Sequence, residues 1–243
     1  MLIIVGALVL ADAATTLLWQ EPVTALQTRI RQHGLGSDLK HLEAKGPTPI
    51  EARALASIDD DRRRIAFLAR SLQRRTTPGD AIGRLKIPRL GADFVLVRGS
   101  DAADLRKGPG TYDGTPLPGV PGTAAIAGHR TTYLAPFRHI DDLKPNDRIT
   151  VEMPYATFTY RVERTRIVDA DALWILKRST QDQLVLSACH PLFSAAQRIV
   201  VFSRLTTVVP LGYARSGQGS DFSPTPLAPA PATADGGGSS SST

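Results

Sequence analysis

The sequence has little cysteine and few aromatic residues. Its 243 residues include one cysteine, Cys189, and aromatic side chains make up 6% of the chain. A single cysteine excludes an intramolecular disulfide and a cysteine-rich zinc site. Hydrophobic residues nevertheless form 42% of the chain, which is enough for one sizeable core. We therefore expect one domain with attachments, in which the single thiol is retained for a reason.

Neither end of the chain has the composition of a folded domain. Residues 1–20 are predominantly apolar, interrupted by Asp12 and a few threonines, and their length suits a transmembrane helix with Trp19 at the interface. A cleaved signal peptide is the alternative, but a basic n-region and a small-residue cleavage site are missing. Residues 207–243 are mostly Gly, Pro, Ser, Thr and Ala, which predicts a disordered low-complexity tail.

The net charge of +6 allows nucleic-acid binding but does not favour it. The densest basic stretch, "DDDRRRIAFLARSLQRR" at 59–75, places Ile65, Leu68 and Leu72 at helical spacing. This spacing predicts an amphipathic helix with a solvated basic face. Beside a membrane anchor, such a face suits anionic lipid or cell-wall polymer better than nucleic acid.

Between the two ends the pattern changes from helix to strand. Residues 21–77 are charged and predict a helical connector, with a break at "KGPTP" (45–49). Alternation with a period of two then predicts strands at 81–88, 93–99, 123–129, 147–153, 156–168, 183–189 and 198–205, with short helical stretches near 100–107 and 170–179. Regular strands without long helices between them predict a mainly β domain over 78–206, folded as an antiparallel or mixed barrel.

Three reactive side chains fall at the ends of predicted strands. His129 follows one strand, Cys189 ends another, and Arg198 begins the next. Each alone has an ordinary explanation: a buried thiol, a turn histidine and an edge charge. A barrel brings strand ends together at one rim, so we expect the three to share a groove. There a thiolate is a nucleophile, an imidazole exchanges its proton, and a guanidinium stabilises an oxyanion.

These segments resemble a known family. "GHRTTYLAPFRHIDDLKPNDRITVE" (128–152) and "LVLSACHPLFSAAQRIVVFSRL" (184–205) are similar to the sortases, membrane-anchored cysteine transpeptidases of Gram-positive bacteria. "CHP" after the nucleophile, "GDAIGRLKIPRLG" and "GPGTYDGTPLPGVPGTAAIAGHR" are most like class E. The resemblance implies an eight-stranded sortase barrel over residues 78–206. It also implies Cys189 as the nucleophile, His129 as the general acid/base and Arg198 as the oxyanion-stabilising or substrate-positioning residue.

The resemblance further implies a reaction and its partners. A secreted protein with a C-terminal signal, LAXTG-like for class E or LPXTG-like, would be cleaved between Thr and Gly through a thioacyl-enzyme. An amine of the peptidoglycan precursor lipid II would then receive the protein, with no metal or organic cofactor. The enzyme would sit in the plasma membrane with its barrel outside the cell. The alternatives are a thiol peptidase that releases its acyl-enzyme to water, a non-catalytic envelope-binding barrel and, least favoured, a nucleic-acid-binding module.

One departure from the family concerns the substrate pocket. The family usually has threonine just before the nucleophile, where this chain has Ala188. Ser187, one position earlier, points to the opposite face of a strand from Ala188, which makes it a poor replacement. His190 projects away from its neighbour Cys189 and is for that reason a poor catalytic partner. The candidate substrate-binding residues are Ala188, Ser187, His190 and Tyr112, of which the tyrosine is equally well explained by packing.

Overall fold

The computed structural model describes residues 22–216. The predicted transmembrane anchor at 1–20 lies outside the described residues, as does most of the predicted tail. Within 22–216, no helix combines the length and the apolar character that a bilayer span requires.

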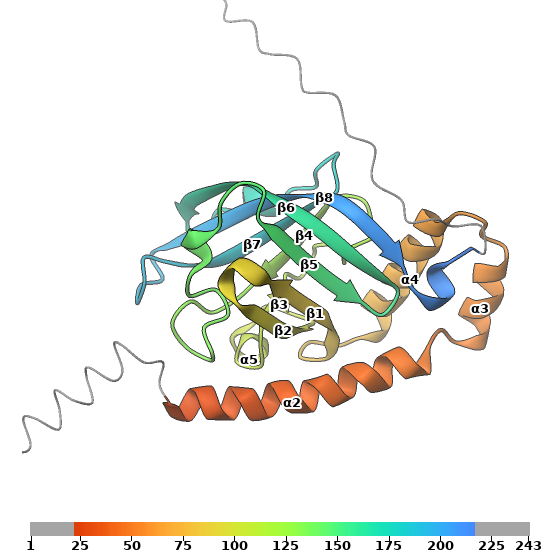
Figure 1. Ribbon diagram of the computed structural model, residues 1–243, viewed down its shortest axis with the longest axis horizontal. Coiled ribbons are helices and arrows are strands. Elements are labelled where there is room, and N and C mark those ends of the chain that lie inside the picture. The colour runs from red at the N-terminus through yellow and green to blue at the C-terminus, as the bar shows by residue number, and fades with distance from the viewer. Residues whose placement is uncertain (1–21, 217–243) are drawn as a thin grey trace, which may run out of the picture.

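The described chain forms eight strands: β1 (Ala81–Ile87), β2 (Ala92–Val97), β3 (Gly110–Thr111), β4 (Thr123–Ala127), β5 (Arg148–Met153), β6 (Ala156–Asp169), β7 (Gln183–His190) and β8 (Gln197–Pro210). They close into a barrel in the order β1-β2-β3-β4-β7-β8-β6-β5 (Figure 1). The pairs β2–β3 and β4–β7 are parallel, and the other pairs are antiparallel. The predicted mixed barrel is therefore confirmed, and β3 is the strand that the alternation did not predict.

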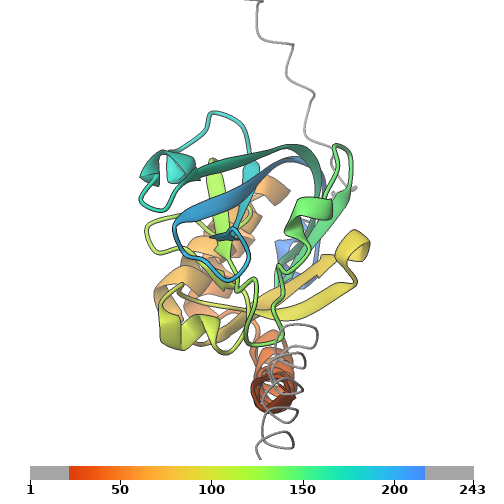
Figure 2. The ribbon, with the colours of Figure 1, turned by 90° about the vertical axis from the view of Figure 1, so that its left-hand side faces the viewer.

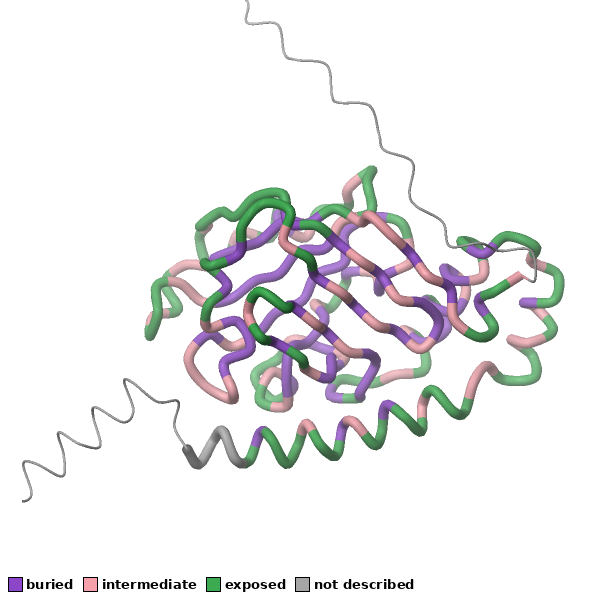
Figure 3. The backbone as a smooth tube through the Cα atoms, in the orientation of Figure 1, coloured by how far each residue is buried: buried purple, intermediate pink, exposed green. Residues whose placement is uncertain are grey.

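Inward-facing side chains fill the barrel. Val151 of β5 lies opposite Phe158 of β6, and both are fully buried. Phe137 and Ile140, from the segment between β4 and β5, join the same core. This segment includes the 3-10 helix η2 (Ile140–Asp142). Figure 3 shows the buried residues concentrated along the strands. The segment between β4 and β5 is thus fixed to the core by these two side chains.

Three helices precede the barrel, as the charged connector was predicted to form. Helix α2 (Pro22–Lys45) runs along the outside of β1 and β2, where Leu35 and Leu39 are buried (Figure 1). Helix α3 (Pro49–Ala56) begins with a capping box at Thr48. Helix α4 (Asp61–Arg75) buries the apolar side chains Ile65, Leu68 and Leu72, which confirms the amphipathic pattern.

Short helices occupy the two predicted helical stretches. Helix α5 (Ala102–Leu105) lies between β2 and β3, and the 3-10 helix η3 (Leu173–Leu176) lies between β6 and β7. A further 3-10 turn, η1 (Pro88–Leu90), connects β1 to β2. In Figure 2, which turns the molecule by 90°, α2 is seen nearly end-on beneath the barrel.

Ordered structure continues past residue 206, where the sequence pattern had suggested that the barrel ends and the tail begins. Strand β8 runs on to Pro210 because its residues continue to pair with β6 as far as Ala156. The 3-10 helix η4 (Gly212–Ala214) then packs against α4, and the Ser216 backbone N–H donates to Oδ1 of Asp61 at 2.7 Å. The C-terminal end of the described chain is therefore part of the folded domain.

Candidate active site

Strand register pairs two of the three candidate catalytic residues and brings the strand before the third alongside them. Cys189 of β7 lies directly opposite Arg198 of β8, and residues directly opposite in an antiparallel pair share a face. Strand β4 runs parallel to β7 up to the pair Ala127 and Ser187, and the Gly128 N–H donates to the Ser187 carbonyl at 3.1 Å. Continued two residues further, this register would set His129 opposite Cys189.

The candidate residues Cys189 and Arg198 lie on the outer face of the barrel wall. Leu184, Leu186 and Ala188 of β7 belong to the interior core, whereas Val185 packs in a separate cluster outside. Because successive side chains of a strand alternate, Cys189 faces outward with Val185. We call the separate cluster that contains Val185 the outer-face cluster. Its buried members are Ala125, Ile175, Val185, Val200 and Phe202. The candidate site therefore borders a buried apolar cluster formed by β4, β7, β8 and η3.

His129 is partly buried and lacks a partner for one ring nitrogen. Its Nε2 atom is buried and makes no hydrogen bond within the described residues. The ring of Tyr133 lies 5.0 Å from the His129 ring, centroid to centroid. Burial, and after it the positive charge of Arg106, lowers the pKa of His129 below the usual histidine range. A neutral imidazole with an unpaired nitrogen is suited to accept a proton.

Arg198 is partly buried and is tethered to the loop between β7 and β8. Its Nη1 donates to the carbonyl oxygens of Ala195 and Gln197, both at 2.9 Å. The N–H groups of its Nε and Nη2 make no hydrogen bond within the described residues. A guanidinium held by one nitrogen keeps its remaining donors for a substrate oxygen.

The structure separates the predicted substrate-binding residues. Ala188 is 3% exposed and packs in the interior core, on the face away from Cys189. Ser187 lies two residues before Cys189 and so shares its face, and its buried hydroxyl has no hydrogen-bond partner among the described residues. The argument against Ser187 assumed that Ala188 faces the pocket, and this assumption is wrong. Tyr112 packs against the outer-face cluster.

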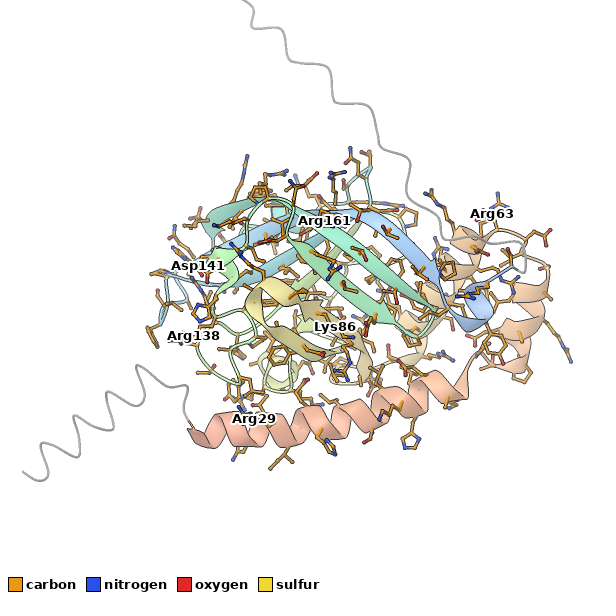
Figure 4. All side chains as sticks on the ribbon, viewed as in Figure 1. Arg29, Arg63, Lys86, Arg138, Asp141 and Arg161 are labelled. Atoms are coloured by element: carbon orange, nitrogen blue, oxygen red, sulfur yellow. The ribbon has the colours of Figure 1, made fainter. Side chains whose placement is uncertain are left out.

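Sequence reasoning missed Arg130. This arginine follows His129 directly, is 3% exposed, and contacts His190 and Asp141. Its position in the sequence was the available signal for its role. Arg130 follows a small apolar strand and the candidate residue His129, and a buried arginine needs charged or hydrogen-bonding partners. Figure 4 shows Asp141 and Arg138 at the end of the barrel opposite Arg63 of α4.

Comparison with known proteins identifies the domain. A family model described as "Sortase domain" matches residues 85–206. Sortase D of Bacillus subtilis (strain 168) is 33% identical over 133 residues, which are 53% of this chain and 66% of that protein. Sortase SrtE1 of Streptomyces coelicolor is 29% identical over 144 residues, which are 53% of this chain and 41% of that protein. The chain therefore spans just under two thirds of the first relative and less than half of the second.

A solved structure agrees with these matches. Sortase E1 from Streptomyces coelicolor, crystallised with a tripeptide in its active site, is 25% identical with a TM-score of 0.51. The match covers 56% of this chain and 93% of that chain. The similarity extends over nearly all of the solved chain. The residues matched by the family model, 85–206, include His129, Cys189 and Arg198.

Proposed function

The chain belongs to the sortase family, and on that premise we propose that it is a cysteine transpeptidase whose catalytic residues are Cys189, His129 and Arg198. The observation that supports this proposal is the strand register, which pairs Cys189 with Arg198 and, if continued two residues past Ala127, would set His129 opposite Cys189. The unpaired Nε2 of His129, together with its lowered pKa, supports a role in proton transfer.

The proposed reaction has two halves. In the first, His129 takes the proton of Cys189, and the sulfur attacks the carbonyl carbon of the scissile peptide bond. Arg198 stabilises the oxyanion, His129 protonates the departing amine, the C–N bond breaks, and a thioester remains on Cys189. In the second half, an acceptor amine gives a proton to His129 and attacks the thioester carbon. The C–S bond breaks, the thiolate regains its proton, and the new amide leaves.

The proposed substrates are secreted proteins with a C-terminal sorting signal cleaved between Thr and Gly. The proposed acceptor is an amine of the cell-wall precursor lipid II. The matched relatives include a sortase D and a sortase E1, and the class E features of the sequence favour an LAXTG-like signal over an LPXTG-like one. The buried, unpaired hydroxyl of Ser187, on the same face as Cys189, is the candidate donor to the bound signal.

The test is mass spectrometry of reaction products. The full chain, purified in detergent, is incubated with an LAXTG or an LPXTG peptide, with and without an amine acceptor. A peptide–acceptor adduct that disappears in Cys189→Ala establishes the transpeptidase. Free acid alone establishes the thiol peptidase that releases its product to water. Absence of cleavage with both peptides favours the non-catalytic envelope-binding barrel.

An extracellular, membrane-anchored location belongs to the same proposal. It rests on the membership of the sortase family and on the apolar composition of residues 1–20. The test compares the full chain with a chain that begins at Pro22 in fractionated bacterial cells. Membrane recovery of the full chain alone, with protease access from outside, supports the proposal. Equal recovery of both chains in the soluble fraction contradicts it.

A further inference from the structure

A buried arginine joins the two segments that carry the catalytic residues. Arg130 follows His129, and its partner His190 follows Cys189. The Nη1 atom of Arg130 lies 2.9 Å from Nδ1 of His190, and its Nη2 lies 2.7 Å from Oδ2 of Asp141. Its guanidinium therefore connects the end of β7 with the segment between β4 and β5.

This contact is made by the residues that directly follow the two members of the proposed catalytic pair. Arg130 is 3% exposed, and His190 is half-buried at the end of β7. Continued three residues past the pair Ala127 and Ser187, the parallel β4–β7 register would set Arg130 opposite His190. The side-chain contact between these two residues agrees with that extension of the register.

The backbone alone gives this part of the site little support. The last β4 residue in the parallel ladder is Ala127, and one further backbone bond, from Gly128, reaches Ser187. The Arg130–His190 contact occurs two residues beyond Gly128. This side-chain contact therefore connects the two segments beyond the end of the backbone ladder, next to the proposed catalytic residues, whose separation must be fixed.

The chemistry of the contact is specific to these side chains. Arginine has only hydrogen-bond donors, so Nδ1 of His190 accepts and the imidazole proton is on Nε2. The remaining guanidinium nitrogens are also engaged, since Nε donates to the carbonyl of Arg138 at 3.3 Å while Nη2 faces Asp141. Lysine, a single point charge, cannot reproduce three donors in a planar fork.

We propose that Arg130 is a positioning residue, which with His190 forms a latch that holds His129 in line with Cys189. The inference rests on the proposed function, because the latch acts through the proposed catalytic pair. Neither latch residue needs to touch the substrate for this role. Loss of the latch allows the two segments to separate and weakens the step in which His129 and Cys189 act together.

Steady-state kinetics of the full chain in detergent give the first test. We expect Arg130→Met and His190→Leu each to lower kcat by about 10-fold to 100-fold, with little change in the KM of the sorting peptide. His190→Asn keeps an acceptor near the position of Nδ1 and should retain most of kcat. The double variant Arg130→Met/His190→Leu should lose no more than the worse single variant. Arg148→Met removes an exposed arginine of β5 and is the matched control.

Alkylation of Cys189 by iodoacetamide gives a second test that needs no substrate. In the wild-type chain, His129→Ala should change the alkylation rate because the imidazole acts on the thiol. In the Arg130→Met background, the same substitution should have almost no effect. If His129→Ala changes the rate equally in both backgrounds, the latch does not position the pair and the inference is overturned. Equal kcat in His190→Leu and wild type would overturn it as well.

The two tests separate the inference from the proposed function. A wild-type chain that cleaves no sorting peptide contradicts the proposed function, while the alkylation rates still decide on the latch. Thermal melting of each variant checks folding. If Arg130→Met does not fold, His190→Leu carries the same measurements, because it leaves the ion pair between Arg130 and Asp141 in place.

Discussion

Gly128→Ala should damage the active site although it adds only one methyl group. A Cβ at Gly128 would lie 2.6 Å from Cδ2 and 2.7 Å from Cε2 of Phe137, where ordinary contact begins at 3.4 Å. The ring of Phe137 is fully buried, and its backbone N–H donates to the carbonyl of His129 at 3.1 Å. The residue that meets the new methyl group is therefore the same residue that holds the backbone of His129.

The size of the effect follows from the overlap. Relief of the clash requires a movement of about 0.8 Å in the ring or in the backbone of Gly128. Overpacking of a core by one methyl group typically costs about 1–3 kcal/mol of stability. A displacement of about 1 Å at a reacting group can cost about 100-fold in rate, which corresponds to about 2.7 kcal/mol of transition-state stabilisation. We therefore expect kcat/KM to fall by about 10-fold to 100-fold and the free energy of unfolding to fall by about 1–3 kcal/mol.

The assay combines urea denaturation with peptide transpeptidation. Phe137→Leu removes the ring that the methyl group would strike, so it should restore part of the activity in the Gly128→Ala background, and the two changes should not be additive. Gly36→Ala in α2 is the matched control because a Cβ there meets nothing within 4 Å. It should raise stability by about 0.5–1 kcal/mol without changing kcat/KM. Wild-type stability and kcat/KM in Gly128→Ala would refute the reasoning.

Four further predictions concern His129, helix α2 and the buried core. The positive charge of Arg106 is the second cause, after burial, of the lowered pKa of His129. Arg106→Gln removes this charge, so an NMR titration should show a higher pKa for His129. An unchanged or lower pKa would contradict this account. Because that pKa is lower in the folded than in the unfolded chain, the protein should be less stable at about pH 5 than at about pH 7.5, as urea melts will show. Gln32→Ala removes three hydrogen bonds between α2 and the barrel and should increase hydrogen exchange in α2, whereas unchanged exchange would argue against a docked helix. Tyr155→Phe leaves the carbonyl of Pro118, bonded at 2.6 Å, without its donor and should cost about 1–3 kcal/mol in urea denaturation, a result that an unchanged midpoint would contradict.

Much of the fold was predictable because several barrel strands alternate between buried and more exposed residues. In β6, for example, Phe158, Tyr160 and Val162 are buried, and the residues between them are not. Strand β3 shows the limit of this reasoning. Its two residues, Gly110 and Thr111, are too few to display a period, so only their pairing with β2 and β4 reveals a strand. The predicted last strand ended at Leu205, whereas β8 continues to pair with β6 as far as Pro210.

The identity of the candidate catalytic residues was predictable, but the face on which their neighbours lie was not. Alternation states that Ser187 and Ala188 face opposite sides, without stating which side is the barrel interior. The interior is determined by packing of Ala188 against the core, which no local pattern reports. Arg130 was missed for a related reason, since its partners His190 and Asp141 are distant in the sequence and come together only through the parallel β4–β7 pair.

The three consecutive residues after β4, Gly128, His129 and Arg130, each make a different contribution to the candidate site. Gly128 gives the room that Phe137 needs, the carbonyl of His129 accepts from the Phe137 backbone N–H, and Arg130 contacts His190. A shift of the β4–β7 register by one residue would break the backbone bond from Gly128 to Ser187 and misalign Arg130 with His190. The short backbone contact before the histidine and the buried side-chain contact after it both oppose this shift. If His129 and Cys189 act together as proposed, substitutions at Gly128 and Arg130, on either side of the histidine, should therefore affect catalysis more than their distance from the substrate suggests.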